Sequence, residues 1–130
     1  MRGKHRRIDA MAGAERIVCS SSDLVDSGDA VRFEVLVDGK PEPAFAVRYR
    51  GRVYAYLNRC AHMPMELDWK PGKFFDAWGL HLICSTHGAT YAPDTGRCLR
   101  GPCFKEGLVS IPVEESGGSV VVKGDRHGRS

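Results

Sequence analysis

Two short motifs constrain this chain more than any other feature: Cys60-Ala-His62 and Cys84-Ser-Thr-His87, separated by 21 residues. Each motif offers one thiolate and one imidazole within a stretch too short to cross a protein, so each pair fits the tip of a loop. Two Cys and two His suit a [2Fe–2S] cluster in which Cys binds one iron and His the other. The fold must then bring two loops together from separate parts of the chain.

A structural zinc site is the alternative for the same four residues, because two Cys and two His are also a zinc-binding set. Zinc fingers and ribbons usually begin with two Cys spaced by two to four residues. Here each motif instead pairs one Cys with one His. This pairing favours iron–sulfur over zinc.

The sequence around the motifs resembles the Rieske family. Three segments carry the resemblance: a first ligand loop, a second ligand loop with the hairpin that follows it, and a proline-containing loop. They are Asn58–His62, Cys84–Tyr91 with Asp94–Arg97, and Gly101-Pro102. The resemblance covers about residues 15–123 and implies a stand-alone Rieske ferredoxin with one [2Fe–2S] cluster per chain. Its ligands would be Cys60, His62, Cys84 and His87.

The spacer between the two motifs departs from the family, because it is a few residues longer than usual. The segment Asp68–Gly72 is expected to form an extra loop there.

The resemblance also bears on the reduction potential. High-potential members carry a further Cys in each ligand loop, joined as a disulfide, where this chain has Met65 and Ser85 or Thr86. They also have a Ser where this chain has Ala89. Tyr91 matches a Tyr that bonds a ligand sulfur in those members, although hairpin packing explains it equally well. The potential is therefore expected in the lower part of the Rieske range. The candidate residues for tuning it are Gly88, Ala89, Tyr91 and Pro102.

Composition and patterning predict one all-β domain. Gly accounts for 15 and Pro for 7 of the 130 residues, which favours short strands and turns. Ser20–Leu24 predicts a short helical turn capped by Ser. The pattern predicts strands over residues 31–37, 44–49, 53–57, 80–83, 89–92, 97–99, 108–113 and 120–123, with a turn over 114–119.

The Rieske resemblance implies small antiparallel sheets divided between two parts. A base would contain about residues 15–57 and 106–123, and a cluster-binding subdomain about 58–105. Residues 1–14 and 124–130 are expected to be disordered tails. The net positive charge comes from the ends of the sequence: the chain is +3 overall, yet residues 10–122 are −2.

Several classes of function are not expected. The sequence has no basic face interleaved with aromatic residues, so nucleic-acid binding is not expected. The sequence contains no run of 18 apolar residues, so a transmembrane helix is not expected. The expected location is the cytoplasm. The chain has no Gly-x-Gly-x-x-Gly motif and too few remaining His for a mononuclear iron site, so no catalysis by the chain alone is expected.

The remaining Cys and His have simpler interpretations. Cys98 and Cys103 are open to a local disulfide, to free thiols or to burial as small apolar groups, with thiols favoured in a cytoplasmic protein. Cys19 is expected to be structural. His81 is expected to be a packed or surface residue rather than a ligand.

The predicted function is electron transfer by a monomeric carrier, from a flavoprotein reductase to a terminal oxygenase. Two alternatives remain: the small subunit of an assimilatory nitrite reductase, and a redox-sensing or interaction module.

Overall fold

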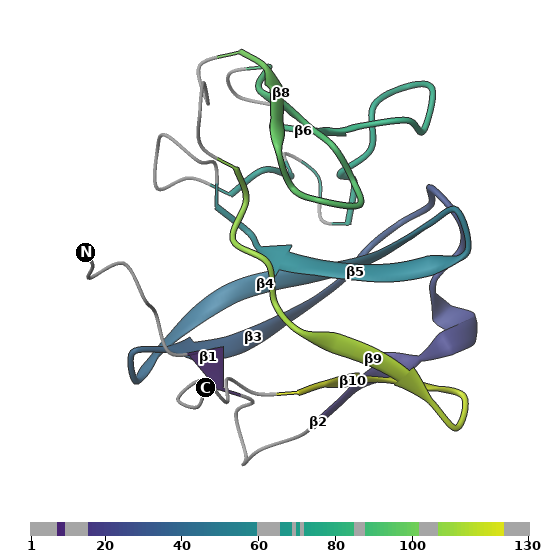
Figure 1. The fold of residues 1–130 in the computed structure, drawn as a ribbon, viewed down its shortest axis with the longest axis vertical. Coiled ribbons are helices and arrows are strands. Elements are labelled where there is room, and N and C mark those ends of the chain that lie inside the picture. The colour runs from purple at the N-terminus through teal and green to yellow at the C-terminus, as the bar shows by residue number, and fades with distance from the viewer. Residues whose placement is uncertain are drawn as a thin grey trace.

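The structure is a computed structural model that describes residues 8–9, 16–59, 66–68, 70, 72–84, 88–101 and 107–123. Three small sheets lie one above another in it (Figure 1). The strands are β1 (Ile8–Asp9), β2 (Arg16–Ser20), β3 (Val31–Val37), β4 (Lys40–Tyr49), β5 (Arg52–Leu57), β6 (Leu82–Ile83), β7 (Thr90–Tyr91), β8 (Cys98–Arg100), β9 (Val113–Ser116) and β10 (Ser119–Val122).

The middle sheet has the order β1-β3-β4-β5, and two three-stranded sheets flank it. One is β2-β10-β9 and the other is β6-β7-β8. Every pair of neighbouring strands is antiparallel. The predicted all-β class is therefore confirmed.

Two tight hairpins of the middle sheet were readable from their turn residues. Asp38-Gly39 joins β3 to β4, and Arg50-Gly51 joins β4 to β5; all four residues have positive φ. Two-residue turns of this kind match the twist of antiparallel strands and favour Gly at the second position. They fix the register of the middle sheet, for example Ala46 opposite Ala55.

The prediction for the last hairpin was wrong in its boundaries. The expected strand over 108–113 is largely an extended segment, and β9 runs instead through part of the expected turn. Pro112 cannot donate to a ladder, so regular pairing starts after it. Gly117-Gly118, both with positive φ, then make the turn into β10.

The structure also contains two strands that the sequence pattern did not predict. β1 lies within the expected N-terminal tail and pairs with β3, Ile8 opposite Val37. β2 pairs with β10, at the far end of the chain. Its side chains do not alternate cleanly, since Ile17 is 65% exposed, and this hides the strand from pattern analysis. The predicted helical turn is confirmed as a 3₁₀ turn at Ser21–Asp23.

The middle sheet separates two apolar cores, because successive side chains of a strand face opposite ways. In β4, Ala44 and Ala46 face the core shared with the β2-β10-β9 sheet, whereas Phe45 and Val47 face the β6-β7-β8 sheet. The first core contains Leu24, Val35, Val37, Ala44, Ala46, Ala55, Leu57, Ile111, Val120 and Val122. The second contains Phe45, Val47, Tyr56, Leu67, Phe74, Leu82, Cys84, Ala89, Tyr91 and Leu108.

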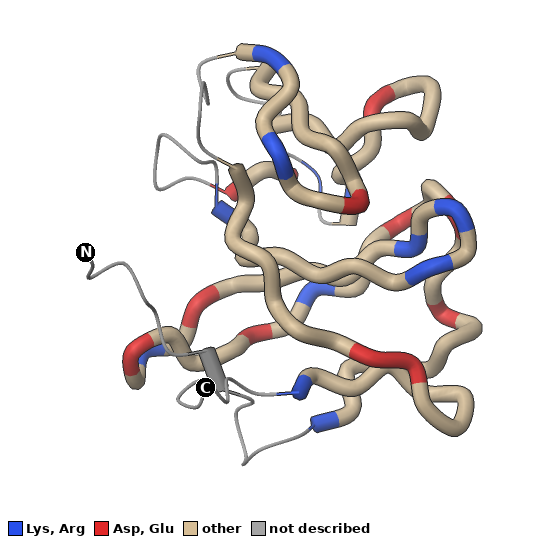
Figure 2. Tube along the Cα trace, viewed as in Figure 1, with Lys and Arg blue, Asp and Glu red and all other residues tan. Residues whose placement is uncertain are grey.

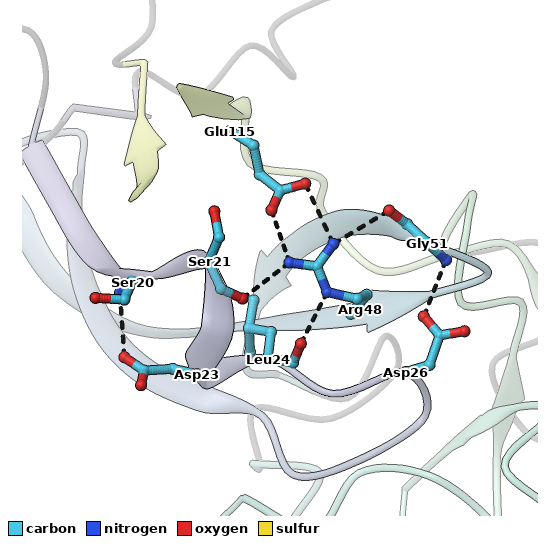
Figure 3. Close-up of polar contacts among 8 residues, drawn as sticks. All are labelled: Ser20, Ser21, Asp23, Leu24, Asp26, Arg48, Gly51 and Glu115. Carbon is cyan, nitrogen blue, oxygen red and sulfur yellow. Dashed lines mark hydrogen bonds and ion pairs between the residues drawn. The ribbon is translucent and has the colours of Figure 1, made fainter. Parts of the chain in front are cut away.

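Arg48 joins the middle sheet to the β2-β10-β9 layer (Figure 3). Its guanidinium donates to both carboxylate oxygens of Glu115, at 2.6 and 3.2 Å. It also donates to the carbonyl oxygens of Leu24, Ser21 and Gly51, at 2.8, 2.9 and 3.1 Å. The planar group thus satisfies five acceptors at one corner of the base.

Candidate metal centre

One of the four predicted ligands, Cys84, lies among the described residues; Cys60, His62 and His87 lie outside them. Cys84 directly follows β6 and is completely buried in the second core. A thiol at the end of a packed strand has a fixed position, which a metal ligand requires.

The second ligand loop is closed by backbone hydrogen bonds on both sides of residues 85–87. Cys84 N–H donates to the carbonyl oxygen of Ala89, and Gly88 N–H donates to the carbonyl oxygen of Cys84, both at 2.8 Å. Below them, Ile83 pairs with Thr90 across β6 and β7. Gly88 has a φ of +73°, a conformation that favours Gly. Residues 85–87, which include His87, are therefore flanked on both sides by hydrogen-bonded backbone.

The start of the proline-containing loop packs against this second loop. A Cβ atom on Gly101 would lie 2.8 Å from Cα of Ala89, and Gly101 has a φ of +95°. Both the close approach and the φ value require Gly there. Pro102 itself lies outside the described residues.

The first ligand loop begins and ends at a buried side chain. Asn58 is 1% exposed, and its Oδ1 accepts the N–H of Leu67 at 2.8 Å. Its own N–H donates to the carbonyl oxygen of Pro43 in β4, also at 2.8 Å. The Asn58 amide therefore connects the residues that flank the segment containing Cys60 and His62.

The extra loop expected at Asp68–Gly72 is described at Asp68, Lys70 and Gly72. Asp68 Oδ2 accepts the N–H of Gly72 at 3.0 Å, which draws the two ends of this segment together.

Two residues of the candidate potential-tuning set are buried beside Cys84. Tyr91 and Ala89 are both fully buried and belong to the same core as the thiol. Tyr91 lies opposite Leu82 across β6 and β7. Their effect on potential stays a prediction.

His81 is held by a neighbouring carboxylate. Its Nδ1 lies 3.2 Å from Oδ2 of Asp76, whose Oδ1 accepts the N–H of Leu80 at 3.0 Å and that of Trp78 at 3.2 Å. Burial alone would raise the pKa of Asp76, but the hydrogen bonds from Leu80 and His81 lower it overall. His81 thus packs in a surface loop, as expected, and Trp78 at the tip of that loop is 79% exposed.

The cysteines outside the motifs differ from one another. Cys98 is disulfide-bonded, with a partner outside the described residues, so the thiol favoured from the sequence is corrected at this position. Cys19 is free and half-buried, and burial raises the pKa of its thiol.

Three further observations concern the described residues as a whole. Across the described residues, basic and acidic residues are interspersed along the chain in all three layers (Figure 2). Within the same ranges, no cluster of three or more His, Cys, Asp or Glu is placed to hold a metal ion, and no helix is long and apolar enough to cross a membrane.

The family sequence model for the Rieske [2Fe–2S] domain matches residues 14–116, most of the chain. The chain belongs to the Rieske family. Known structures agree. The ferredoxin of carbazole 1,9a-dioxygenase from Nocardioides aromaticivorans IC177 is 26% identical, with a TM-score of 0.67, over 87% of this chain and 100% of that one.

Two further Rieske structures match at lower identity and support the fold. The ferredoxin of Sphingomonas yanoikuyae B1 is 20% identical with a TM-score of 0.63, over 84% of this chain and 97% of that one. The terminal oxygenase of the Nocardioides enzyme is 22% identical with a TM-score of 0.67, over 85% of this chain and 30% of the oxygenase. No curated protein sequence matches this chain.

A Rieske domain binds a [2Fe–2S] cluster, and the described residues fit that cofactor. The thiol of Cys84 is buried at the start of a closed loop, where it would supply a sulfur donor, and Gly101 allows the next loop to approach the backbone of Ala89 closely. The cluster supplies one-electron chemistry. This Rieske protein is therefore an electron carrier.

Proposed function

We propose that this Rieske protein is a cytoplasmic, monomeric ferredoxin that carries single electrons from a flavoprotein reductase to a terminal oxygenase. The observation that carries the proposal is the match over the full length of the Nocardioides dioxygenase ferredoxin, at 26% identity. A related structure is a complex of oxygenase and ferredoxin in carbazole 1,9a-dioxygenase, which supports an oxygenase as the acceptor.

We further propose that Cys60 and Cys84 bind one iron and that His62 and His87 bind the other. The spacing of the two motifs supports this assignment, and so does the burial of Cys84 at the end of β6. Neutral His ligands lower the negative charge of the cluster relative to four thiolates, which raises its potential above that of an all-Cys site.

The described residues contribute rigidity to this function. The hydrogen bonds between Cys84, Gly88 and Ala89 hold the second loop, and the apolar core beneath it excludes water. A site that moves little when its charge changes needs little reorganisation for each electron transfer.

The first test is low-temperature electron paramagnetic resonance on anaerobically purified protein. We expect a silent oxidised state and a rhombic signal after dithionite, with an average g value below that of all-Cys clusters. Iron-free protein that binds zinc with the same four residues would overturn the assignment.

The second test is for the partners. We expect reduction by NAD(P)H through a flavoprotein reductase, followed by reoxidation with a Rieske-type oxygenase in the presence of its substrate. Co-purification with a large haem-containing subunit would instead indicate a nitrite reductase. A cluster that is reduced by no reductase and oxidised by no oxygenase would contradict the carrier role.

A further inference from the structure

A fully buried carboxylate lies beside the first ligand loop, in the longer-than-usual spacer. The side chain of Asp68 has no exposed surface, and its Oδ1 accepts a hydrogen bond from Nδ2 of Asn58 at 2.9 Å. Its Oδ2 accepts the N–H of Gly72 at 3.0 Å and lies 3.5 Å from Nε of Arg32. Burying a carboxylate is costly unless its oxygens are paired, and here both are.

The loop that contains Asp68 is attached to the base of the molecule. The carbonyl oxygen of Gly72 accepts the N–H of Ala30 at 2.9 Å. Gly72 has a φ of +85°, and a Cβ there would lie 3.3 Å from the carbonyl oxygen of Ala30. Next to it, Lys73 pairs with Asp29 at 2.6 Å. Asp68 is thus linked to the base through Gly72 as well as to Asn58.

The carboxylate determines which way the Asn58 amide faces. The oxygen and nitrogen ends of an Asn side chain have nearly the same shape, but one accepts and the other donates. Asp68 can only accept, so it selects Nδ2 and leaves Oδ1 for the N–H of Leu67 at 2.8 Å. The hydrogen bond between Leu67 N–H and Asn58 Oδ1 connects the two residues that flank the segment 59–66.

We propose that Asp68 is a positioning residue for the cluster: through the Asn58 amide it fixes the two ends of the loop that carries Cys60 and His62. This inference rests on the proposed ligand set and assigns a role to the extra loop in the spacer. The extra residues supply the carboxylate that orients the first pair of ligands.

The test compares holoprotein variants that differ in donor and acceptor pattern. Asp68→Asn keeps the shape of the side chain but cannot accept from both Asn58 and Gly72, so one donor must face another donor. We expect the rate of cluster loss in chelator to rise about tenfold, as loss of one charge-assisted hydrogen bond implies. We also expect shifted g values or broader lines in the electron paramagnetic resonance spectrum, and a changed midpoint potential.

The rescue variant exchanges the two side chains, Asn58→Asp with Asp68→Asn. The new carboxylate at position 58 accepts from Leu67 and from the amide at position 68, whose oxygen then accepts from Gly72. The pattern is complementary again at unchanged net charge. We expect the signal and the rate of cluster loss to return to within about threefold of the original protein.

The matched control is Glu66→Gln. Glu66 also pairs with Arg32, at 2.7 Å, but its side chain is 45% exposed. Among the described residues, the hydrogen bonds of Asn58 Nδ2 and Gly72 N–H go to Asp68 and not to Glu66. This change removes the same charge two residues away. It should leave the g values and the rate of cluster loss unchanged.

Three results would overturn the inference. Asp68→Asn could behave as the original protein, the exchanged variant could be as defective as the single one, or Glu66→Gln could reproduce the defect. If the single variant fails to fold, recovery of the signal in the exchanged variant still supports the proposal, and failure of both overturns it. A failure of the ligand set is seen separately, as absence of the rhombic signal in the unchanged protein.

Discussion

The hydroxyl of Tyr56 in β5 donates a hydrogen bond of 2.8 Å to the carbonyl oxygen of Pro93, in the turn that leads from β7 towards β8. Tyr56 is 2% exposed, and a Cβ on Gly96 would lie 2.7 Å from its ring. The middle sheet thus contacts the hairpin that follows the second ligand loop through this hydrogen bond and through the Tyr56 ring.

Replacing Tyr56 by Phe should destabilise the protein by about 1–2 kcal/mol, because the buried carbonyl oxygen of Pro93 loses its donor. Urea unfolding of the holoprotein measures this. Tyr54→Phe is the matched control, since Tyr54 also packs against the second core but is only partly buried. Equal effects of the two changes would contradict the role of the Tyr56 hydroxyl.

The same hydroxyl predicts an alkaline limit on stability. Burial, with a smaller contribution from Asp94, raises the pKa of Tyr56 well above its ordinary value. Unfolded Tyr ionises near pH 10, whereas the folded side chain stays protonated there. Its contribution is therefore complete below about pH 10 and is lost as the pH rises further. Tyr56→Phe should flatten that fall in a series of unfolding curves above pH 9.

At the opposite side of the base, Arg48→Lys should cost about 2 kcal/mol of stability, because Lys cannot satisfy five acceptors in one plane. Glu115→Gln should cost less, since the carboxylate is partly exposed and solvent screens the pair. Unfolding midpoints at pH 7 test this order, and a larger effect for Glu115→Gln would contradict it.

Glu115 also predicts an acid dependence. The hydrogen bonds from Arg48 lower the pKa of the Glu115 carboxyl. Its contribution to stability is therefore present above the ordinary Glu value of about 4.3 and is lost as the pH falls through the lower folded-state value. The unfolding midpoint of Glu115→Gln should fall less between pH 5 and pH 3 (about the range in which Glu titrates) than that of the unchanged protein.

Gly101→Ala should lower cluster retention. Its Cβ would collide with the backbone of Ala89 beside the second ligand loop. Gly118→Ala is the matched control, because Gly118 also has positive φ, +83°, but no atom within 4 Å of the added Cβ. Both changes should cost about 1 kcal/mol of backbone strain. Only Gly101→Ala should reduce the ratio of iron to protein; equal iron content would contradict the collision.

Tyr91→Phe should lower the midpoint potential if its hydroxyl donates to a ligand sulfur, because such a bond stabilises the more negative reduced cluster. We predict this outcome, and equilibrium redox titration measures it. An unchanged potential would leave Tyr91 with packing as its role. The midpoint of the unchanged protein is itself predicted to fall in the lower part of the Rieske range.

Removal of the cluster should loosen one layer and spare the rest. Cys84, the predicted ligand among the described residues, is part of the second core and not of the first. After chelation, amide hydrogen exchange should accelerate in β6, β7 and β8 and stay slow in β3, β4 and β10. Uniform acceleration over all strands would contradict this division.

Local signals in the sequence were sufficient for the hairpins of the middle sheet. Asp38-Gly39 and Arg50-Gly51-Arg52 predict turns on their own chemistry, and the structure has turns with positive φ at both places. The family resemblance then supplied the arrangement of these parts, which no local pattern contains.

Long-range partners were not predictable in the same way. The pairing of Arg16 with Val122 joins strands that are far apart in the sequence, and the burial of side chains along β2 does not alternate cleanly. The Asn58–Asp68 pair was equally hidden, since an Asp beside a Trp and a Lys in a presumed loop gives no sign of complete burial. Such contacts depend on which surfaces meet, and this depends on the whole fold.

The alternation of side chains in β4 makes its register unusually costly to change. A slip of one residue against β3 would turn Phe45 and Val47 towards the first core and bring Ala44 and Ala46 beneath Cys84. One core would then be overfilled and the other left with a cavity, so a single pairing error would penalise both layers at once. A chain with this mispairing would therefore be destabilised in both cores, and the base and the cluster-binding layer depend on the same register of β4.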